Sequence, residues 1–126
     1  MQLLRITLLL QTIYYLVTAL WALIHIQSFI KVTGPKTDIW LVKTVAVLLL
    51  AISISFITAL LYKTYNNSVI TLGTACCIAL IVIDCYYVWN NTISKIYLLD
   101  ALAEGILLTL WLIVMLRRGK RKQSVN

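Results

Sequence analysis

The chain has 126 residues, of which 62% are hydrophobic and 12% are charged, and its mean hydropathy is +0.95. A soluble domain is about 45–50% apolar and about 25% charged. This chain is therefore too apolar, and has too few charged residues, to be a soluble enzyme, a disordered tail or a secreted disulfide scaffold. The net charge of +7 comes mainly from a basic stretch near the C-terminus. The composition predicts an integral membrane protein with one small domain.

Four long apolar runs, separated by short polar turns, make up most of the chain. They cover residues 6–30, 39–62, 69–89 and 96–116. A helix needs about 20 residues to cross a bilayer, and these runs lack the alternation of barrel strands. The turns are too short for anything but antiparallel neighbouring helices. The predicted fold class is therefore all-α, an integral membrane four-helix bundle with up-down-up-down topology.

The bundle is expected to form one transmembrane domain at residues 1–116, followed by a basic tail at residues 117–126. Seven of the eleven lysines and arginines lie near the N-terminus, in the second turn or in this tail, and four lie on the other side. Cytoplasmic segments are enriched in these residues, which predicts that both termini are cytoplasmic in a cell membrane. The tail would also suit anionic lipid headgroups, although a topology signal is the simpler interpretation.

Ionisable side chains inside the spans are the main candidates for function. His25, Lys43, Asp84 and Asp100 come from four different spans, and each lies about 6–8 Å below the outer end of its span, with Glu104 at about 12 Å. Such groups avoid lipid and face a bundle interior or a water-filled cavity. Their matched depth predicts a polar pocket, open to the outer side, that binds a ligand or relays protons. Four aromatic residues are expected to line it: Tyr14, Trp21, Tyr87 and Tyr97.

The charges within this predicted pocket do not balance. Three carboxyl groups face at most two cations, and three carboxylates would not all ionise together in a low dielectric. We expect Glu104, the deepest acid, to hold a proton, while His25 and Lys43 offset the remaining charge. The alternative interpretation is an interhelical network that locks the bundle and binds nothing.

The sequence contains no motif for a metal, a cofactor or catalysis. There is one histidine, without a second ligand at metal-binding spacing, and the three cysteines fall in one span without a CxxC pattern. No nucleotide-binding or hydrolase motif is present. The sequence therefore predicts no metal and no cofactor, and it does not favour an enzyme.

Two segments resemble those of known membrane proteins. The first runs from Phe29 to Thr44 and contains Val32-Thr33-Gly34-Pro35-Lys36-Thr37-Asp38-Ile39-Trp40, and the second is Asp84 together with Tyr97 to Glu104. Both resemble small bacterial four-helix membrane proteins of unassigned function, and the layout is loosely similar to DoxX-like proteins. The resemblance implies a bacterial inner membrane and no particular activity. Small multidrug-resistance exporters share the length, but their functional glutamate is in the first helix, which has no acid here.

Three functions remain open from the sequence. The leading hypothesis is a multi-pass membrane protein that binds or moves a cation, a proton or a small molecule through the polar pocket. The first alternative is an accessory or assembly subunit whose buried charges are structural. The second is a proton-coupled small exporter that works as a dimer. The expected partners are the lipid bilayer and either another membrane protein or a second copy, and nucleic acid is not expected because no folded basic surface exists.

Overall fold

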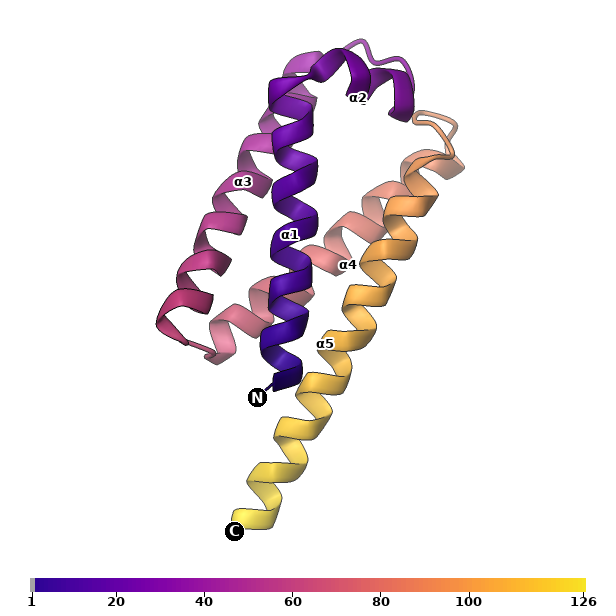
Figure 1. Ribbon diagram of the computed structural model, residues 1–126. Helices are drawn as coiled ribbons and strands as arrows, with labels where there is room; N and C mark the ends of the chain where they lie inside the picture. The colour runs from indigo at the N-terminus through magenta and orange to yellow at the C-terminus, as the bar shows by residue number, and fades with distance from the viewer. Residues whose placement is uncertain (1) are drawn as a thin grey trace.

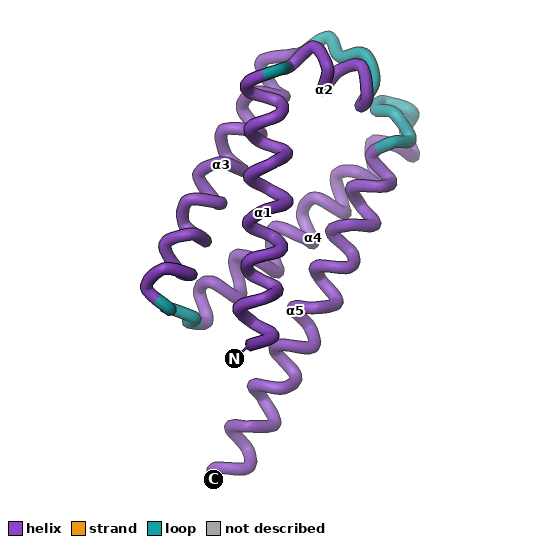
Figure 2. Tube along the Cα trace, in the orientation of Figure 1, coloured by secondary structure: helices purple, strands orange, loops and turns teal. Residues whose placement is uncertain are grey.

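The computed structural model describes residues 2–126 and is helical apart from short connections (Figures 1 and 2). The helices are α1 (Gln2–Ile24), α2 (Ile26–Thr33), α3 (Ile39–Tyr62), α4 (Asn67–Trp89) and α5 (Tyr97–Val125). The described residues contain no strand. Four helices, of 23, 24, 23 and 29 residues, are long and apolar enough to cross a membrane. The prediction of an all-helical chain with four candidate spans is confirmed.

The long helices alternate in direction along the chain (Figure 1). Both termini and the α3–α4 connection at residues 63–66 lie at one end of the molecule, which we call the terminal end. The short helix α2 and the connections at residues 34–38 and 90–96 lie at the opposite end, which we call the loop end. The long helices alternate in direction because the connections between them are short, so each helix runs back toward the end where the previous one began.

The first predicted span is not one continuous helix. The sequence predicts a single helix at residues 6–30, but the helix breaks at His25, where φ is −136° and ψ is 68°. The Nδ1 atom of His25 accepts a hydrogen bond from the backbone N–H of Ser28 at 3.2 Å, so the histidine caps the N-terminus of α2. The side chain competes with the helical backbone, and the chain turns away from the axis of α1 at this point (Figure 1).

The final helix is longer than its predicted span. The sequence predicts a span at residues 96–116 and a tail at residues 117–126, whereas α5 continues as one helix to Val125. The other boundaries are closer: α3 spans the predicted residues 39–62, and α4 begins at Asn67. Asn66 starts α4 because its Oδ1 accepts from the backbone N–H of Val69 at 3.0 Å.

The helices pack as two antiparallel pairs. α1 lies along α3, and α4 lies along α5, while the two pairs meet chiefly through α1 and α5. The expectation that all consecutive spans are packed neighbours is therefore wrong for α3 and α4, which make little contact although only residues 63–66 join them. A short turn brings two helix ends together, but it does not force the helices to run side by side.

Two groups of buried apolar residues show where the pairs join. One includes residues from all four long helices: Leu4, Leu8, Phe56, Ala59, Ile70, Cys77, Leu107, Trp111 and Val114. The other includes residues from α1, α2 and α3 only: Ala19, Ala22, Phe29 and Ala46. We call the first the shared core and the second the loop-end core. The pairs are thus packed together toward the terminal end, and α4 and α5 take no part in the core at the loop end.

Candidate functional site

A buried glutamine of α1 connects the two helix pairs. Gln11 is fully buried, and its Nε2 donates to the backbone oxygen of Gly73 at 3.0 Å. Its Oε1 accepts a hydrogen bond from Nε1 of Trp111 at 2.7 Å. Gln11 Nε2 also donates to the hydroxyl of Tyr15 at 3.1 Å and lies 3.4 Å from Sγ of Cys77. One amide therefore satisfies polar groups on α1, α4 and α5, which fixes how α1 sits against the α4–α5 pair.

Close packing at this point depends on a glycine. A Cβ atom at Gly73 would lie 2.7 Å from two carbons of the Trp111 ring, which is inside any permitted contact. The missing side chain lets the indole of α5 lie against the backbone of α4. Small residues at helix contacts allow this kind of approach within membranes.

Three carboxyl groups lie on the loop-end side of the Gln11 contacts. Glu104 is fully buried, and its Oε2 accepts a hydrogen bond from the hydroxyl of Tyr15 at 3.2 Å. Asp100, one turn earlier on α5, is half-buried and accepts a hydrogen bond from the hydroxyl of Tyr14. Asp84 of α4 is 4% exposed, and its carboxyl group faces that of Asp100. We call Asp84, Asp100 and Glu104 the carboxyl cluster.

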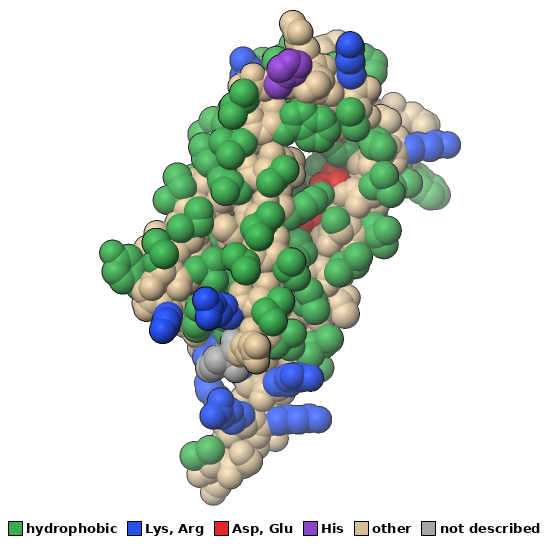
Figure 3. All heavy atoms as spheres, in the orientation of Figure 1, with side chains coloured by type: hydrophobic (Ala, Val, Ile, Leu, Met, Phe, Trp, Pro, Cys, Tyr) green, Lys and Arg blue, Asp and Glu red, His purple; other side chains and the backbone are tan. Residues whose placement is uncertain are grey.

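Two oxygen atoms of the carboxyl cluster are buried without any hydrogen-bond partner, Oδ2 of Asp84 and Oε1 of Glu104. No lysine, arginine or histidine within residues 2–126 pairs with a member of the cluster. Figure 3 shows acidic atoms, in red, at the bottom of a hollow between α1 and α5. Keeping a carboxylate ionised at such a place costs several kcal/mol unless a proton or a cation neutralises it.

The two basic residues predicted for the pocket do not join the cluster. His25 is exposed at the break between α1 and α2, where its ring bonds to Ser28. Lys43 is exposed on α3, the helix that makes little contact with α4. Matched depth brought only three of the five predicted residues together, because depth specifies one coordinate and the direction around each helix specifies another.

Of the four aromatic residues predicted to line the pocket, one contacts the carboxyl cluster through a hydrogen bond and three, within residues 2–126, do not. Tyr14 contacts the cluster through its hydroxyl group. Trp21 instead donates from Nε1 to Oγ of Ser28 at 2.8 Å. Tyr87 is 42% exposed and stacks edge-on against its neighbour Tyr86. The ring of Tyr97 lies under the ammonium group of Lys36, 4.7 Å from the ring centroid, at the outermost turn of α5.

Two residues outside the set predicted from the sequence, Tyr15 and Gln11, belong to the site. Tyr15 donates to Glu104, and Gln11 orients Tyr15. Gln11 recurs with Thr7, Tyr14 and Thr18 at spacings of three or four residues, which places these polar side chains on one face of α1, and this pattern is a usable signal in the sequence. Tyr15 lies next to Tyr14, and the pattern does not indicate that both of these adjacent tyrosines reach the cluster, as they do.

The cluster is not arranged as a metal centre. Within residues 2–126, no group of three or more histidine, cysteine, aspartate or glutamate side chains is placed to hold a metal ion. Its chemistry is that of carboxyl groups and phenol hydroxyls, which hold and exchange protons and attract positive charge.

Comparison with protein-family models, curated proteins and solved structures finds no match to this chain. The resemblance to DoxX-like proteins therefore stays a prediction from the sequence.

Proposed function

We propose that this chain is a multi-pass membrane protein with its terminal end on the cytoplasmic side. Its four long helices are apolar enough to cross a membrane. Seven of its eleven lysines and arginines belong to segments at the terminal end, which is the distribution that cytoplasmic segments have. The loop end then faces the opposite side of the membrane, and the carboxyl cluster lies in the half of the bundle nearer to it.

We propose further that the carboxyl cluster takes up a proton or a small organic cation. The observation that carries this proposal is the pair of buried oxygens without partners, one on Asp84 and one on Glu104. A structural ion-pair network would place cations against these atoms, and none is there. Ionisable groups inside a membrane are costly, and a site of this kind is their usual role.

The surrounding hydroxyl groups suit a site that changes its charge. Tyr14 and Tyr15 donate hydrogen bonds to Asp100 and Glu104, and a carboxylate accepts such bonds more strongly than a protonated carboxyl does. These bonds support the ionised form, while burial supports the protonated one. The balance lets a proton, or a cation in its place, enter and leave without unfolding the bundle.

Infrared spectroscopy of the full-length protein in lipid vesicles tests this proposal. Titration with acid should produce the carbonyl band of a buried protonated carboxyl, and tetraphenylphosphonium should reduce that band if an organic cation replaces the proton. Asp84→Asn and Glu104→Gln should each remove part of the band. Asp38→Asn is the matched control, because Asp38 is an exposed acid in the loop before α3. Identical spectra for wild type and both cluster variants at every pH would exclude the proposal.

An accessory subunit of a larger membrane assembly is the second candidate. The observation that favours it is the small contact between α3 and α4, which leaves an apolar side of each helix without an intramolecular neighbour. Light scattering in mild detergent measures the mass of the purified particle. A second protein present in stoichiometric amount would support the accessory-subunit function. A particle of two identical chains would support the dimeric exporter. A monomer that retains the carboxyl band would count against both functions.

A further inference from the structure

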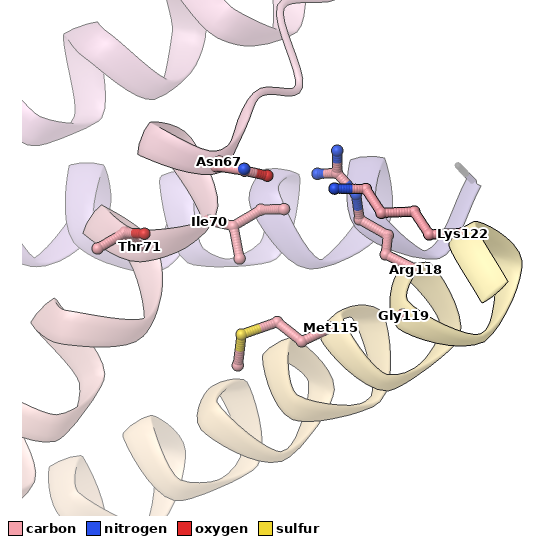
Figure 4. Close-up of a pocket in the computed structure, with 7 residues that line it drawn as sticks. All are labelled: Asn67, Ile70, Thr71, Met115, Arg118, Gly119 and Lys122. Atoms are coloured by element: carbon pink, nitrogen blue, oxygen red, sulfur yellow. The ribbon is translucent and has the colours of Figure 1, made fainter. Parts of the chain in front are cut away.

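A pocket of about 380 Å³ opens at the terminal end, between the start of α4 and the end of α5 (Figure 4). It lies at the opposite end of the bundle from the carboxyl cluster and shares no residue with it. Its lining residues come from two helices: Asn67, Ile70 and Thr71 of α4, and Met115, Arg118, Gly119 and Lys122 of α5.

The charge around this pocket has one sign. All four carboxylate side chains of the chain belong to the loop before α3, the end of α4 or the first turns of α5, so none is at the terminal end. Seven lysines and arginines are at the terminal end, and Figure 3 shows blue side chains there with no red ones on the visible face. Within residues 2–126, no acidic side chain lies at this end to neutralise these cations, so the terminal end carries a strong positive charge.

Two of these cations are directed at the pocket itself. Arg118 is half-buried, and its Nη1 donates to the backbone oxygen of Tyr65 at 3.3 Å, which holds the guanidinium beside the start of α4. Lys122 lies one turn further along α5, and Figure 4 shows its ammonium group beside the guanidinium, with both facing the side chain of Asn67. A guanidinium and an ammonium side by side form a phosphate-binding arrangement, and Figure 4 shows the amide oxygen of Asn67 on the side toward them.

The inner part of the pocket is apolar. Ile70 and Met115 line it on the side toward the middle of the bundle, as Figure 4 shows. Gly119 lines the pocket without a side chain, and no atom lies within 4 Å of the position that a Cβ would occupy there. The polar part therefore lies at the end of the span and the apolar part lies along it, which is the order of groups in a phospholipid.

We propose that this pocket binds one anionic phospholipid, with the phosphate on Arg118 and Lys122 and the acyl region against Ile70 and Met115. A free phosphate ion would use the polar groups alone and would leave the apolar part of the pocket empty. A basic tail that only marks topology would need no lined cavity. The site lies in the leaflet at the terminal end, whichever side of the cell that is, so it does not depend on the function of the carboxyl cluster.

Native mass spectrometry of the delipidated full-length protein tests the site. We expect one tightly bound dioleoyl phosphatidylglycerol per chain, with dioleoyl phosphatidylcholine binding at least tenfold more weakly. The double variant Arg118→Gln/Lys122→Gln should weaken phosphatidylglycerol binding by about tenfold or more, since each cation near a lipid surface contributes substantially to attraction. The matched control is Arg117→Gln/Lys120→Gln, which removes the same charge from α5 at exposed positions outside the pocket.

A second variant separates the pocket from the charge. Gly119→Leu retains every cation, adds a bulky side chain to the lining of the pocket and replaces a helical glycine with a better helix former, so α5 should remain folded. It should weaken the tight phosphatidylglycerol binding by about tenfold. Equal losses in both double variants, or no loss in Gly119→Leu, would overturn the proposal in favour of diffuse attraction by the tail. Displacement of the lipid by millimolar inorganic phosphate would overturn the lipid assignment in favour of a free anion.

Discussion

The two ends of the bundle are packed in different ways. Toward the terminal end, all four long helices contribute to the shared core, and Gln11 bonds to both α4 and α5 across it. At the loop end, the core contains only α1, α2 and α3, and its residues are mainly alanines with one phenylalanine. The carboxyl cluster lies where the shared core ends. The difference indicates that rigidity is concentrated at one end and that space for a polar site is left toward the other.

The comparison also concerns charge. All charged side chains at the terminal end are lysines or arginines, whereas the chain's four acidic side chains lie nearer the loop end. If the shared core holds the helix pairs together, changes in it should destabilise the whole bundle. Equivalent changes at the loop end should cost much less. Three pairs of variants compare the two ends directly.

The largest difference is expected between two tryptophans. Trp111 is fully buried in the shared core, so Trp111→Ala should lower the free energy of unfolding by about 3–5 kcal/mol through the cavity it leaves. Trp21, at the loop end, is 37% exposed and packs edge-on against Phe29, so Trp21→Ala should cost about 1 kcal/mol. Unfolding in mixed lipid–SDS micelles measures both values. Equal costs would mean that the two ends are equally well packed.

A smaller effect is expected from a single methyl group at the contact between α4 and α5. Gly73→Ala places a Cβ against the ring of Trp111 and should destabilise the bundle by about 1–3 kcal/mol. Gly105→Ala is the control, because a Cβ there meets no atom within 4 Å, and removing a helical glycine should stabilise by up to about 1 kcal/mol. The same unfolding experiment measures the change in the free energy of unfolding for both variants, which should have opposite signs. A neutral Gly73→Ala would contradict the tight approach of the indole.

The smallest effect is expected from the glutamine that joins the pairs. Gln11→Leu retains the size of the side chain but leaves Nε1 of Trp111 without a partner and removes the second hydrogen bond to the oxygen of Gly73, which lies inside α4, so it should cost about 1 kcal/mol. Gln27→Leu is the control, since Gln27 is exposed on α2 and forms no hydrogen bond within the described residues through its side chain. Gln11→Leu should also change the accessibility of Trp111 to a fluorescence quencher. An unchanged Trp111 signal would show that the amide does not position the indole.

The sequence was informative about the elements and less so about their contacts. Asp84, Asp100 and Glu104 were selected because acids are costly inside a span, and the structure places them together. The depth of His25 and its spacing from the other polar residues of the first span predict a place in the pocket, but a histidine three residues before a serine can also cap a helix, as it does here. The depth of Lys43 also predicts a place in the pocket, but its long side chain can reach the membrane surface without facing the bundle.

By itself, the sequence determined that the chain forms four apolar helices, where their turns fall and which end is basic. These properties follow from local composition, since apolar length, turn residues and charge need no knowledge of neighbours. Only the tertiary structure decided that the helices pack as two pairs, that the pairs join through Gln11 and Trp111, and that the acids meet without a cation. Those features depend on the rotation of each helix about its own axis. In a chain that is apolar on nearly every face, only the few close contacts between small and polar residues set that rotation.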